Sequence, residues 1–384
     1  MQSGEFADRV IDHEFANLGF DVDGEGNERS RVRVTGLGQK PMSFFIIRTG
    51  EQLRILGTSY SLEALGVAAL DALDAHQVDT ARQWLTWAHE SISTTTDEQS
   101  FFRRGFARLW SPEASMSDDE LRVAAASLAA MDGIAEREGD ILKDAYRTAS
   151  GERRQMLGIA LGFGYITAHR WNEAIPLLGE VLRADRRWKA GLEALISSDL
   201  MVGAVGEADQ ALTNAQSDMG DVEVKRMRAR IAFTQGDVAK ARKLLAEVVV
   251  SGDATNEDRN EIGWVSIAQS TPDPGALDML RKLNSDPGGA SAGSYHTLAC
   301  LYAVNGRGAE ARDALRRFIT GYGGTVSPAQ VQLIQGLLAE SYGERALARQ
   351  FYELASTDTK TSSPLDSAHM AKLRLKMLDA RSSR

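Results

Sequence analysis

The stretch that decides the fold of this 384-residue chain is Leu161-Gly162-Phe163-Gly164-Tyr165, then His169-Arg170-Trp171-Asn172-Glu173-Ala174, then Leu178. It reads as Leu-Gly-x-x-Tyr, a turn, and Ala-x-x-x-Leu. The small residue returns after steps of 34, 33, 35, 35 and 37 residues, at Ala208, Ala241, Ala276, Ala311 and Ala348. A large apolar residue stands four positions after each alanine: Leu178, Leu212, Leu245, Leu280, Leu315 and Tyr352. This period predicts a stack of helix–turn–helix units.

A turn separates the two helices of each unit. A glycine lies five residues before most of the repeated alanines, at Gly203, Gly236, Gly306 and Gly343. His76 and His169 occupy the inter-helix turn of their own units, where a polar residue is ordinary. An earlier unit fits the same pattern, with Ala68 and Ala69 in its first helix and Ala81, Leu85 and Ala88 in its second.

The repeated pattern resembles the tetratricopeptide repeat (TPR) family, whose 34-residue unit carries Trp-x2-Leu-Gly-x2-Tyr, then Ala-x3-Phe, then Pro. The first helix of the unit matches best at Leu161, Gly162 and Tyr165, and again at Tyr295, Leu298, Ala299 and Tyr302. The family's closing proline is absent from most units, and Trp264 and Arg228 stand where a small or apolar residue is usual. Residues 96–154 fit poorly, as one or two degenerate pairs. The resemblance covers about two thirds of the chain and implies an all-α, TPR-like, right-handed helical solenoid.

The two ends of the chain differ from the repeats between them. Residues 1–60 alternate apolar and polar positions around turn-rich residues 23–27 and 49–51, which predicts a small antiparallel sheet of three or four strands with one helix. Residues 61–362 hold the TPR-like units. Ser363 and Pro364 predict the start of a final helix within 363–384, because serine caps helices and proline suits their first position. We expect this helix to cap the last unit and the β-rich segment to cap the first. The apolar stripe of the final helix is Leu365, Ala368, Ala371, Leu375 and Leu378.

Composition and charge exclude several classes of protein. Apolar residues make up 43% of the chain and charged residues 25%, which is typical of a soluble globular protein. A net charge of -9 argues against the broad basic surface that a nucleic acid or an anionic membrane would require. No apolar run is long enough to insert across a bilayer. The opening Met1-Gln2-Ser3-Gly4-Glu5 is typical of a trimmed N-terminus, so the compartment, cytoplasmic or exported, stays open.

The sequence offers no convincing catalytic or metal-binding set. Its six histidines include no pair at ligand spacing. The single cysteine, Cys300, is expected to be a small buried residue. Residues 21–27 begin like a calcium loop, but Val32 stands where the bidentate glutamate belongs. We therefore expect no catalytic residue, no cofactor and no metal.

The remaining candidate for function is the inner surface of the solenoid, which the first helices of TPR-like units line. Its predicted partner-binding residues are Ile159, Phe163, Ile166, Glu193, Arg226, Arg230, Phe233 and His296. Ile159 and Phe163 have a second reading, because side chains at these positions also serve to contact neighbouring units. The groove would hold a protein or peptide.

One stretch of this surface is strongly basic. Residues 225–230 carry four positive charges within about one and a half helical turns. Such a run usually forms a solvated face or pairs with neighbouring acids. In an acidic protein it would also suit a carboxylate or phosphate of a partner. The Lys/Asn set with which some TPR proteins hold a C-terminal carboxylate is not recognisable here.

The resemblance therefore implies a non-enzymatic scaffold for protein–protein interaction, with a peptide or protein segment bound in its groove. Two alternatives stay open. One is an enzyme, either an α/α toroid with paired central carboxylates or a larger enzyme whose C-terminal interaction region is this chain. The other is a structural module that dimerises or holds a neighbouring domain. The sequence names neither the partner nor the oligomeric state.

Overall fold

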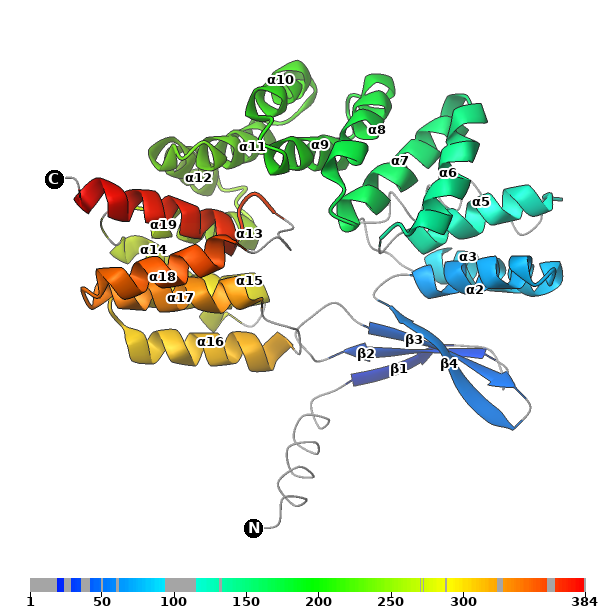
Figure 1. The fold of residues 1–384 in the computed structure, drawn as a ribbon, viewed down its shortest axis with the longest axis horizontal. Coiled ribbons are helices and arrows are strands. Elements are labelled where there is room, and N and C mark those ends of the chain that lie inside the picture. Colours follow the sequence, from blue (N-terminus) through cyan, green and yellow to red (C-terminus); the bar gives the residue numbers. More distant parts are fainter. Residues whose placement is uncertain are drawn as a thin grey trace, which may run out of the picture. The chain divides into compact units, whose positions relative to one another are not determined.

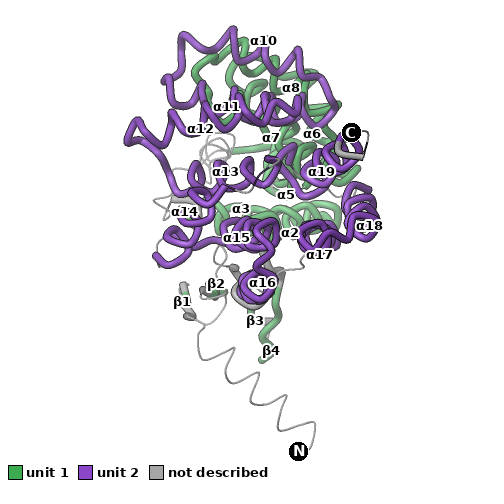
Figure 2. Tube along the Cα trace, turned by 90° about the vertical axis from the view of Figure 1, so that its left-hand side faces the viewer, with its two compact units in different colours: residues 1–194 green, residues 195–384 purple. Residues whose placement is uncertain are grey.

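A computed structural model describes residues 19–23, 29–35, 42–49, 51–59, 62–93, 115–130, 133–269, 271, 273–286, 289–322, 327–357 and 363–382. The chain divides into two compact units, residues 1–194 and residues 195–384 (Figure 2). The first unit contains a small sheet followed by helices, and the second consists of helices (Figure 1).

The sheet has four antiparallel strands in the order of the chain: β1 (Gly19–Asp23), β2 (Arg29–Thr35), β3 (Met42–Thr49) and β4 (Gln52–Ser59). The predicted hairpin is confirmed, because Thr49 pairs with Gln52 across the turn. The register shifts by one residue between Phe45 and Ile46, whose partners are Gly57 and Ile55, so the extra residue of this bulge is Leu56 in β4. The helix expected before the first strand lies outside the described residues.

The sheet packs on the helices that follow it. The Phe45 side chain has no exposed surface and meets the Trp87 ring edge-on, with 5.4 Å between ring centroids. At the margin of this contact, Arg29 donates a 3.0 Å hydrogen bond to Glu90. A four-stranded sheet of this size cannot bury an apolar face by itself, so these contacts with a helix are what stabilise it. That the sheet caps the repeats is still a prediction.

Seven helices of the first part of the chain are described: α2 (Glu63–Asp74), α3 (Val78–Ser93), α5 (Asp118–Ala129), α6 (Glu136–Thr148), α7 (Gly151–Thr167), α8 (Trp171–Ala184) and α9 (Lys189–Met201), which crosses into the second unit. The stretch expected to hold degenerate pairs contains α5 and α6 in its described part. At the crossing of α2 and α5 a Cβ atom on Gly66 would lie 2.4 Å from the Ala129 backbone nitrogen. These two helices therefore touch backbone to backbone, which only glycine permits at that point.

The second unit continues with further pairs. Its helices are α10 (Val205–Ala215), η2 (Gln216–Asp218), α11 (Asp221–Thr234), α12 (Val238–Val250), α13 (Asn256–Ile267), α14 (Pro274–Ser285), α15 (Ala292–Val304), α16 (Gly308–Tyr322), α17 (Pro328–Ser341), α18 (Arg345–Ser356) and α19 (Ser367–Ser382). Within a pair the two helices pack closely, as in α11 with α12, α15 with α16 and α17 with α18. First helices also contact the next first helix, as in α13 with α15 and α15 with α17.

The repeated alanines sit where these helices cross. All six are buried, and Ala174, Ala208, Ala241, Ala311 and Ala348 have no exposed surface. The large residue one helical turn later packs into the partner helix: a Cβ on Gly162 would lie 3.0 Å from Leu178, and one on Gly336 would lie 2.4 Å from Tyr352. Small residues in the first helix thus make room for large ones in the second. The TPR-like helical solenoid predicted from the sequence is confirmed as the fold.

The inter-helix turns share one backbone conformation. Gly203, Gly236, Gly306 and Gly343 have φ between 70° and 84°, and His76 and His169 have φ of 58° at the same place in their units. This left-handed conformation ends the first helix, and glycine adopts it without the steric cost that a Cβ atom brings. The sequence spacing predicts a turn at all six positions, and each is confirmed.

The last helix begins later than predicted. Pro364 lies in a turn and α19 starts at Ser367, where the Asp366 side chain accepts a 2.8 Å hydrogen bond from the His369 backbone N–H. Asp366 therefore caps the helix, in place of Ser363, whose hydroxyl accepts from the Leu365 N–H within the preceding turn. The helix packs on α17 and α18, like an unpaired first helix of one more unit.

Helix α19 also reaches back to earlier repeats. Buried Arg374 donates hydrogen bonds to the backbone oxygens of Ile267 and Gln269 at the end of α13, at 3.0 and 3.1 Å. The same guanidinium forms a 2.6 Å ion pair with Glu340 of α17, which in turn accepts from the Tyr352 hydroxyl. The contacts of Arg374 therefore connect α19 with two first helices of the second unit, α13 and α17.

Candidate functional site

The second unit contains a cavity of about 450 Å³ on the side formed by its first helices. Every helical residue that lines it belongs to a first helix or to α19, and none belongs to a second helix. One wall is the face of α13 that carries Glu257, Asn260, Glu261 and Trp264. Residues 363–368 also line it; they comprise the turn before α19 and the first two residues of that helix. The second unit therefore has an open cavity with a partly polar lining on its first-helix side.

Two of the predicted groove residues, Arg230 and His296, line this cavity. His296 is 5% exposed, and its ring lies between Trp264 and Phe318, with 5.5 Å between centroids on each side. Burial lowers the pKa of His296 to about 4, although the nearby Gln330 carbonyl partly opposes this. The imidazole is therefore neutral at pH 7 and contributes a polar, uncharged surface.

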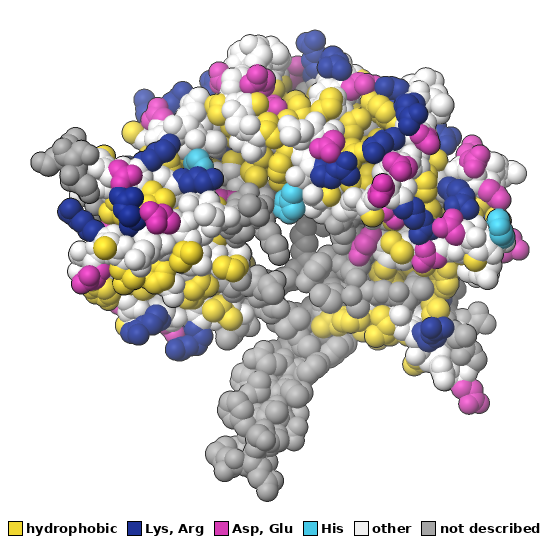
Figure 3. Space-filling view, viewed as in Figure 1, with side chains coloured by type: hydrophobic (Ala, Val, Ile, Leu, Met, Phe, Trp, Pro, Cys, Tyr) yellow, Lys and Arg dark blue, Asp and Glu magenta, His cyan; other side chains and the backbone are white. Residues whose placement is uncertain are grey.

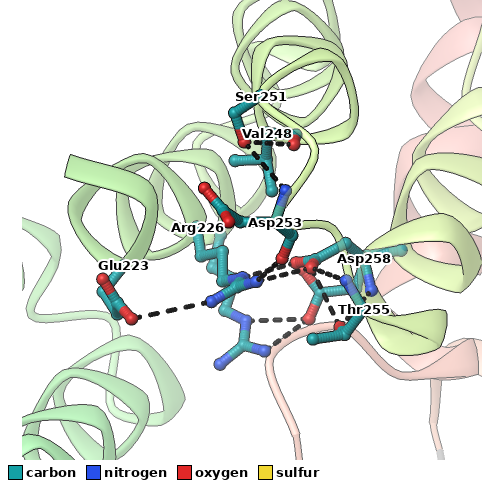
Figure 4. A network of polar contacts seen from close by, with 9 residues as sticks. Glu223, Arg226, Val248, Ser251, Asp253, Thr255 and Asp258 are labelled. Carbon is teal, nitrogen blue, oxygen red and sulfur yellow. Dashed lines mark hydrogen bonds and ion pairs between the residues drawn. The ribbon is translucent and has the colours of Figure 1, made fainter. Parts of the chain in front are cut away.

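The basic stretch is paired within the chain. Arg226 of α11 forms two hydrogen bonds with the Asp258 carboxylate of α13, at 2.6 and 2.7 Å, and a third with the Asp253 carbonyl at 3.2 Å (Figure 4). Arg230 makes a 2.5 Å contact with Glu261 one turn further along both helices. Lys225 pairs with Asp221 and Glu247. Arg226 and Arg230, which the sequence suggested as donors to a partner's carboxylate, thus already donate to carboxylates of the next repeat.

These pairs differ in how burial affects their carboxylates. Burial favours a higher pKa for Asp258, but hydrogen bonds from Arg226 and from the Thr255 backbone and hydroxyl hold the pKa below the usual range. Asp258 also completes the capping box of α13 with Thr255. Glu261 is more deeply buried, and that burial raises its pKa despite the contact with Arg230. The Arg226–Asp258 pair therefore aligns two neighbouring first helices as well as capping one of them.

The remaining predicted groove residue of the second unit belongs to its core. Phe233 has no exposed surface, and its ring lies 5.5 Å from His369 of α19. The sequence register placed Phe233 on the correct side of α11, but α19 covers that position. Phe233 is therefore not available to a partner while α19 is in place.

In the first unit the predicted groove residues lie on α7 and α9. Ile159 is 3% exposed and is a core residue, whereas Phe163 and Ile166 are half-buried and Glu193 is exposed. The Phe163 ring lies 5.8 Å from the buried Trp188 ring, which precedes α9. Phe163 thus contacts the neighbouring repeat, in line with the second reading of the sequence, while part of its surface stays open.

Sequence reasoning missed the two residues on which the cavity wall depends. Asn260 and Trp264 stand at the repeat positions of Ile159 and Phe163, three repeats further along the chain. Counting back from the repeated alanine places Trp264 at the small position of the pattern, but in the structure Gly263 takes that position: a Cβ atom on it would lie 2.4 Å from Leu280, as one on Gly162 would lie 3.0 Å from Leu178. The sequence register was therefore one residue off at α13, and it did not mark Trp264 as part of a cavity wall.

Other chemistry finds no support in the described part of the chain. Cys300 has no exposed surface, and burial raises the pKa of its thiol far above the usual range. No group of three or more His, Cys, Asp or Glu side chains is arranged to hold a metal among the described residues. Residues 24–28 of the calcium-like loop lie outside the described residues. None of the described helices has the length and apolarity needed to cross a membrane.

The surface in Figure 3 mixes charges of both signs. Dark-blue and magenta side chains alternate over the helices of each unit, with apolar side chains between them. This mixture fits the many exposed ion pairs, such as Arg137 with Asp71 and Asp74. Such pairs contribute little to stability but leave no large field of one sign on the face shown.

No family model matches this sequence, and no curated protein matches it either. Among solved structures, the chain is similar to the APC/C hetero-tetramer Cut9-Hcn1, with a TM-score of 0.44 and 15% identity over 82% of this chain and 63% of that one, which is less than two thirds of its length. It is similar to the human IFIT1 dimer with m7Gppp-AAAA, with a TM-score of 0.43 and 13% identity over 85% and 84%. The P58(IPK) TPR domain gives a TM-score of 0.23 and 12% identity over 84% and 99%. The chain's own helix pairs, with their buried alanines and left-handed turns, give it a tetratricopeptide-like fold.

Proposed function

We propose that this chain is a binding scaffold that holds a peptide or protein segment on the first-helix side of its repeats. The observation that carries this proposal is the cavity of the second unit, which is lined by first helices and by residues 363–368 of the chain itself. Residues 363–366 of this lining belong to no helix, so non-helical backbone of the chain already lies on the first-helix side of the unit. A preformed cavity with polar groups along one wall suits the binding of a peptide or protein segment.

The proposal keeps some of the residues predicted from the sequence. Arg230 and His296 line the cavity, and Phe163, Ile166 and Glu193 have surface to offer in the first unit. Ile159 and Phe233 are left out because they are buried, and Arg226 because Asp258 engages it. Affinity would come mainly from a few anchors that enter the cavity, with the surrounding surface excluding water.

A steric block tests this function. Gly293 is exposed in the first turn of α15 beside the cavity, and a Cβ atom there would lie 3.4 Å from the Asn260 amide. Peptides selected from a random library on the full chain, then labelled with fluorescein, should bind Gly293→Phe at least tenfold more weakly than the unmodified chain in fluorescence anisotropy. The added ring would fill the space that a bound segment needs.

Gly206→Phe is the matched control, because Gly206 lies on α10 and a Cβ atom added there would have no neighbouring atom within 4 Å. It should leave the affinity unchanged. A library that yields no binding peptide would contradict the proposed function. So would peptides that bind the Gly293→Phe chain as tightly as the unmodified one.

A further inference from the structure

We infer that the cavity of the second unit receives a cationic side chain, Lys or Arg, from the bound segment. This inference rests on the proposed function and names the chemistry of the partner. It is opposite in sign to the ligand that the basic stretch suggested, because Arg226 and Arg230 of that stretch are paired with acids of α13 and the cavity lining carries more acids than bases.

The charges around the cavity favour a cation. Three carboxylates line it, those of Glu257, Glu261 and Asp366, against one guanidinium, that of Arg230. Arg230 already contacts Glu261, with Nε and Nη2 at 2.9 and 2.5 Å from Oε1. His296 on the adjacent wall adds no positive charge, since it stays neutral down to about pH 4. An incoming carboxylate would meet like charge, whereas an ammonium or guanidinium would offset part of the excess negative charge of the lining.

Two buried polar atoms of α13 indicate which hydrogen-bonding groups the ligand should carry besides its cation. The Trp264 indole Nε1 and the Asn260 Oδ1 have no hydrogen-bond partner within the described structure, and Trp264 is only 7% exposed. An unpaired buried polar group costs on the order of 1–3 kcal/mol, which a ligand recovers by supplying the partner. The indole needs an acceptor and the Asn260 oxygen needs a donor. A peptide with a basic side chain offers both, through a backbone carbonyl and its cationic head.

The aromatic part of the wall suits the same ligand. The Trp264 and His296 rings lie 5.5 Å apart with 37° between their planes, which gives the cavity a flat apolar side. The methylene stem of Lys or Arg packs on such a side, and a charged head over an indole gains a cation–π contribution. The volume of about 450 Å³ lies within the range of clefts that hold ligands.

The test uses the full chain and the peptides selected on it from a random library. Selected peptides should share a Lys or Arg at one position, and replacing that residue by Gln should weaken binding about tenfold.

A variant of the protein tests the same charge from the other side. Glu257→Lys places a positive charge on the exposed rim of the cavity and should weaken binding by about tenfold or more. Asp209→Lys, the same reversal on exposed α10 away from the cavity, should not change the affinity.

A second readout monitors the environment of the Trp264 indole N–H when a peptide binds. The Trp264 indole N–H gives one cross-peak in a ¹H–¹⁵N spectrum, identified by its loss in Trp264→Phe. That cross-peak should shift when a basic peptide binds and should not shift with the Gln-substituted peptide. The same shift produced by acetyl-lysine amide alone would also support a cation site.

The outcomes separate the two proposals. Selected peptides with an acidic or uncharged residue at the shared position would overturn the cationic site but leave the scaffold function standing. Unchanged affinity in Glu257→Lys would do the same. A library without binders would contradict the scaffold function, and the inference would fail with it.

Discussion

Helices α7 and α13 occupy the same place in their repeats, one in each unit, yet they present different chemistry. On α7 the two outward positions are Ile159 and Phe163, and on α13 they are Asn260 and Trp264. Phe163 packs against Trp188 of the next repeat, whereas Trp264 forms a wall of an open cavity. The repeat position thus fixes where a side chain stands, and the neighbouring repeat decides whether that side chain packs against it or lines a cavity.

The units also differ in how they end. The first unit packs a sheet against α3 through Phe45 and Trp87. The second closes with α19, whose Arg374 contacts both α13 and α17. Loss of one partner of a buried ion pair leaves the other charge buried and unpaired, a cost that an apolar contact does not carry.

The largest expected effect comes from breaking that ion pair. Arg374→Ala should destabilise the second unit by about 3–5 kcal/mol, because the Glu340 charge would then be buried without its cation. The two backbone oxygens at the end of α13 would lose their donors as well. Hydrogen exchange followed by mass spectrometry should show faster exchange in α13, α17 and α19, with α7 and α8 of the first unit unchanged.

Lys372→Ala is the control, since Lys372 is exposed on the same helix. Its effect should stay within about 0.5 kcal/mol, as is usual for surface sites. Equal protection of α13 in Arg374→Ala and in the unmodified chain would show that α19 contributes little to the second unit.

Acidification should change the stability of the second unit in opposite directions through two buried groups, His296 and Asp199. Burial lowers the pKa of His296 from 6.5 to about 4, so between these pH values the unfolded chain binds a proton that the folded chain does not. The contribution of neutral His296 to the free energy of unfolding is complete above pH 6.5, and about 3 kcal/mol of it is lost as the pH falls toward 4.

Burial, and secondarily Glu207, raises the pKa of Asp199 to about 6. The folded chain therefore binds that proton first, and stability from Asp199 increases as the pH falls below 6.

Urea unfolding at several pH values measures both contributions. His296→Gln should flatten the loss of stability between pH 6.5 and 4, and Asp199→Asn should make that loss steeper below pH 6. Parallel profiles for the two variants and the unmodified chain would mean that neither group titrates differently on folding.

Much of the fold follows from local spacing. The alanines predicted at the crossings are buried, and the six turn positions adopt the left-handed conformation. These features depend on residues within one repeat or its neighbour, so a sequence pattern contains them. The pairing of Arg226 with Asp258 is nearly as local, because the two stand 32 residues apart, about one repeat.

The site was less predictable because part of it comes from distant residues. Helix α19 covers Phe233 and reaches Ile267, 107 residues before Arg374, and no repeat register encodes that contact. The late start of α19 has a similar cause. Asp366 caps the helix, and Pro364 instead belongs to the turn that forms the cavity wall. Capping preferences alone do not choose between two candidate caps three residues apart.

The smallest expected effects lie in the inter-helix turns, where the first unit uses histidine and the second uses glycine. His76 holds φ of 58° with a Cβ atom, and Gly203 holds φ of 78° without one. His76→Gly should stabilise the first unit by up to about 1 kcal/mol, since the steric cost of the left-handed conformation disappears, although glycine's greater freedom in the unfolded chain reduces the gain. Gly203→Ala should destabilise the second unit by about 1–2 kcal/mol, and for a backbone reason alone, because no atom lies within 4 Å of the new Cβ. Gly206→Ala, three residues further in α10 and equally open, should have the opposite sign, since alanine is the better helix former. Thermal unfolding of the three variants tests the difference between the units, and a stabilised Gly203→Ala would show that this turn is not held in the left-handed conformation.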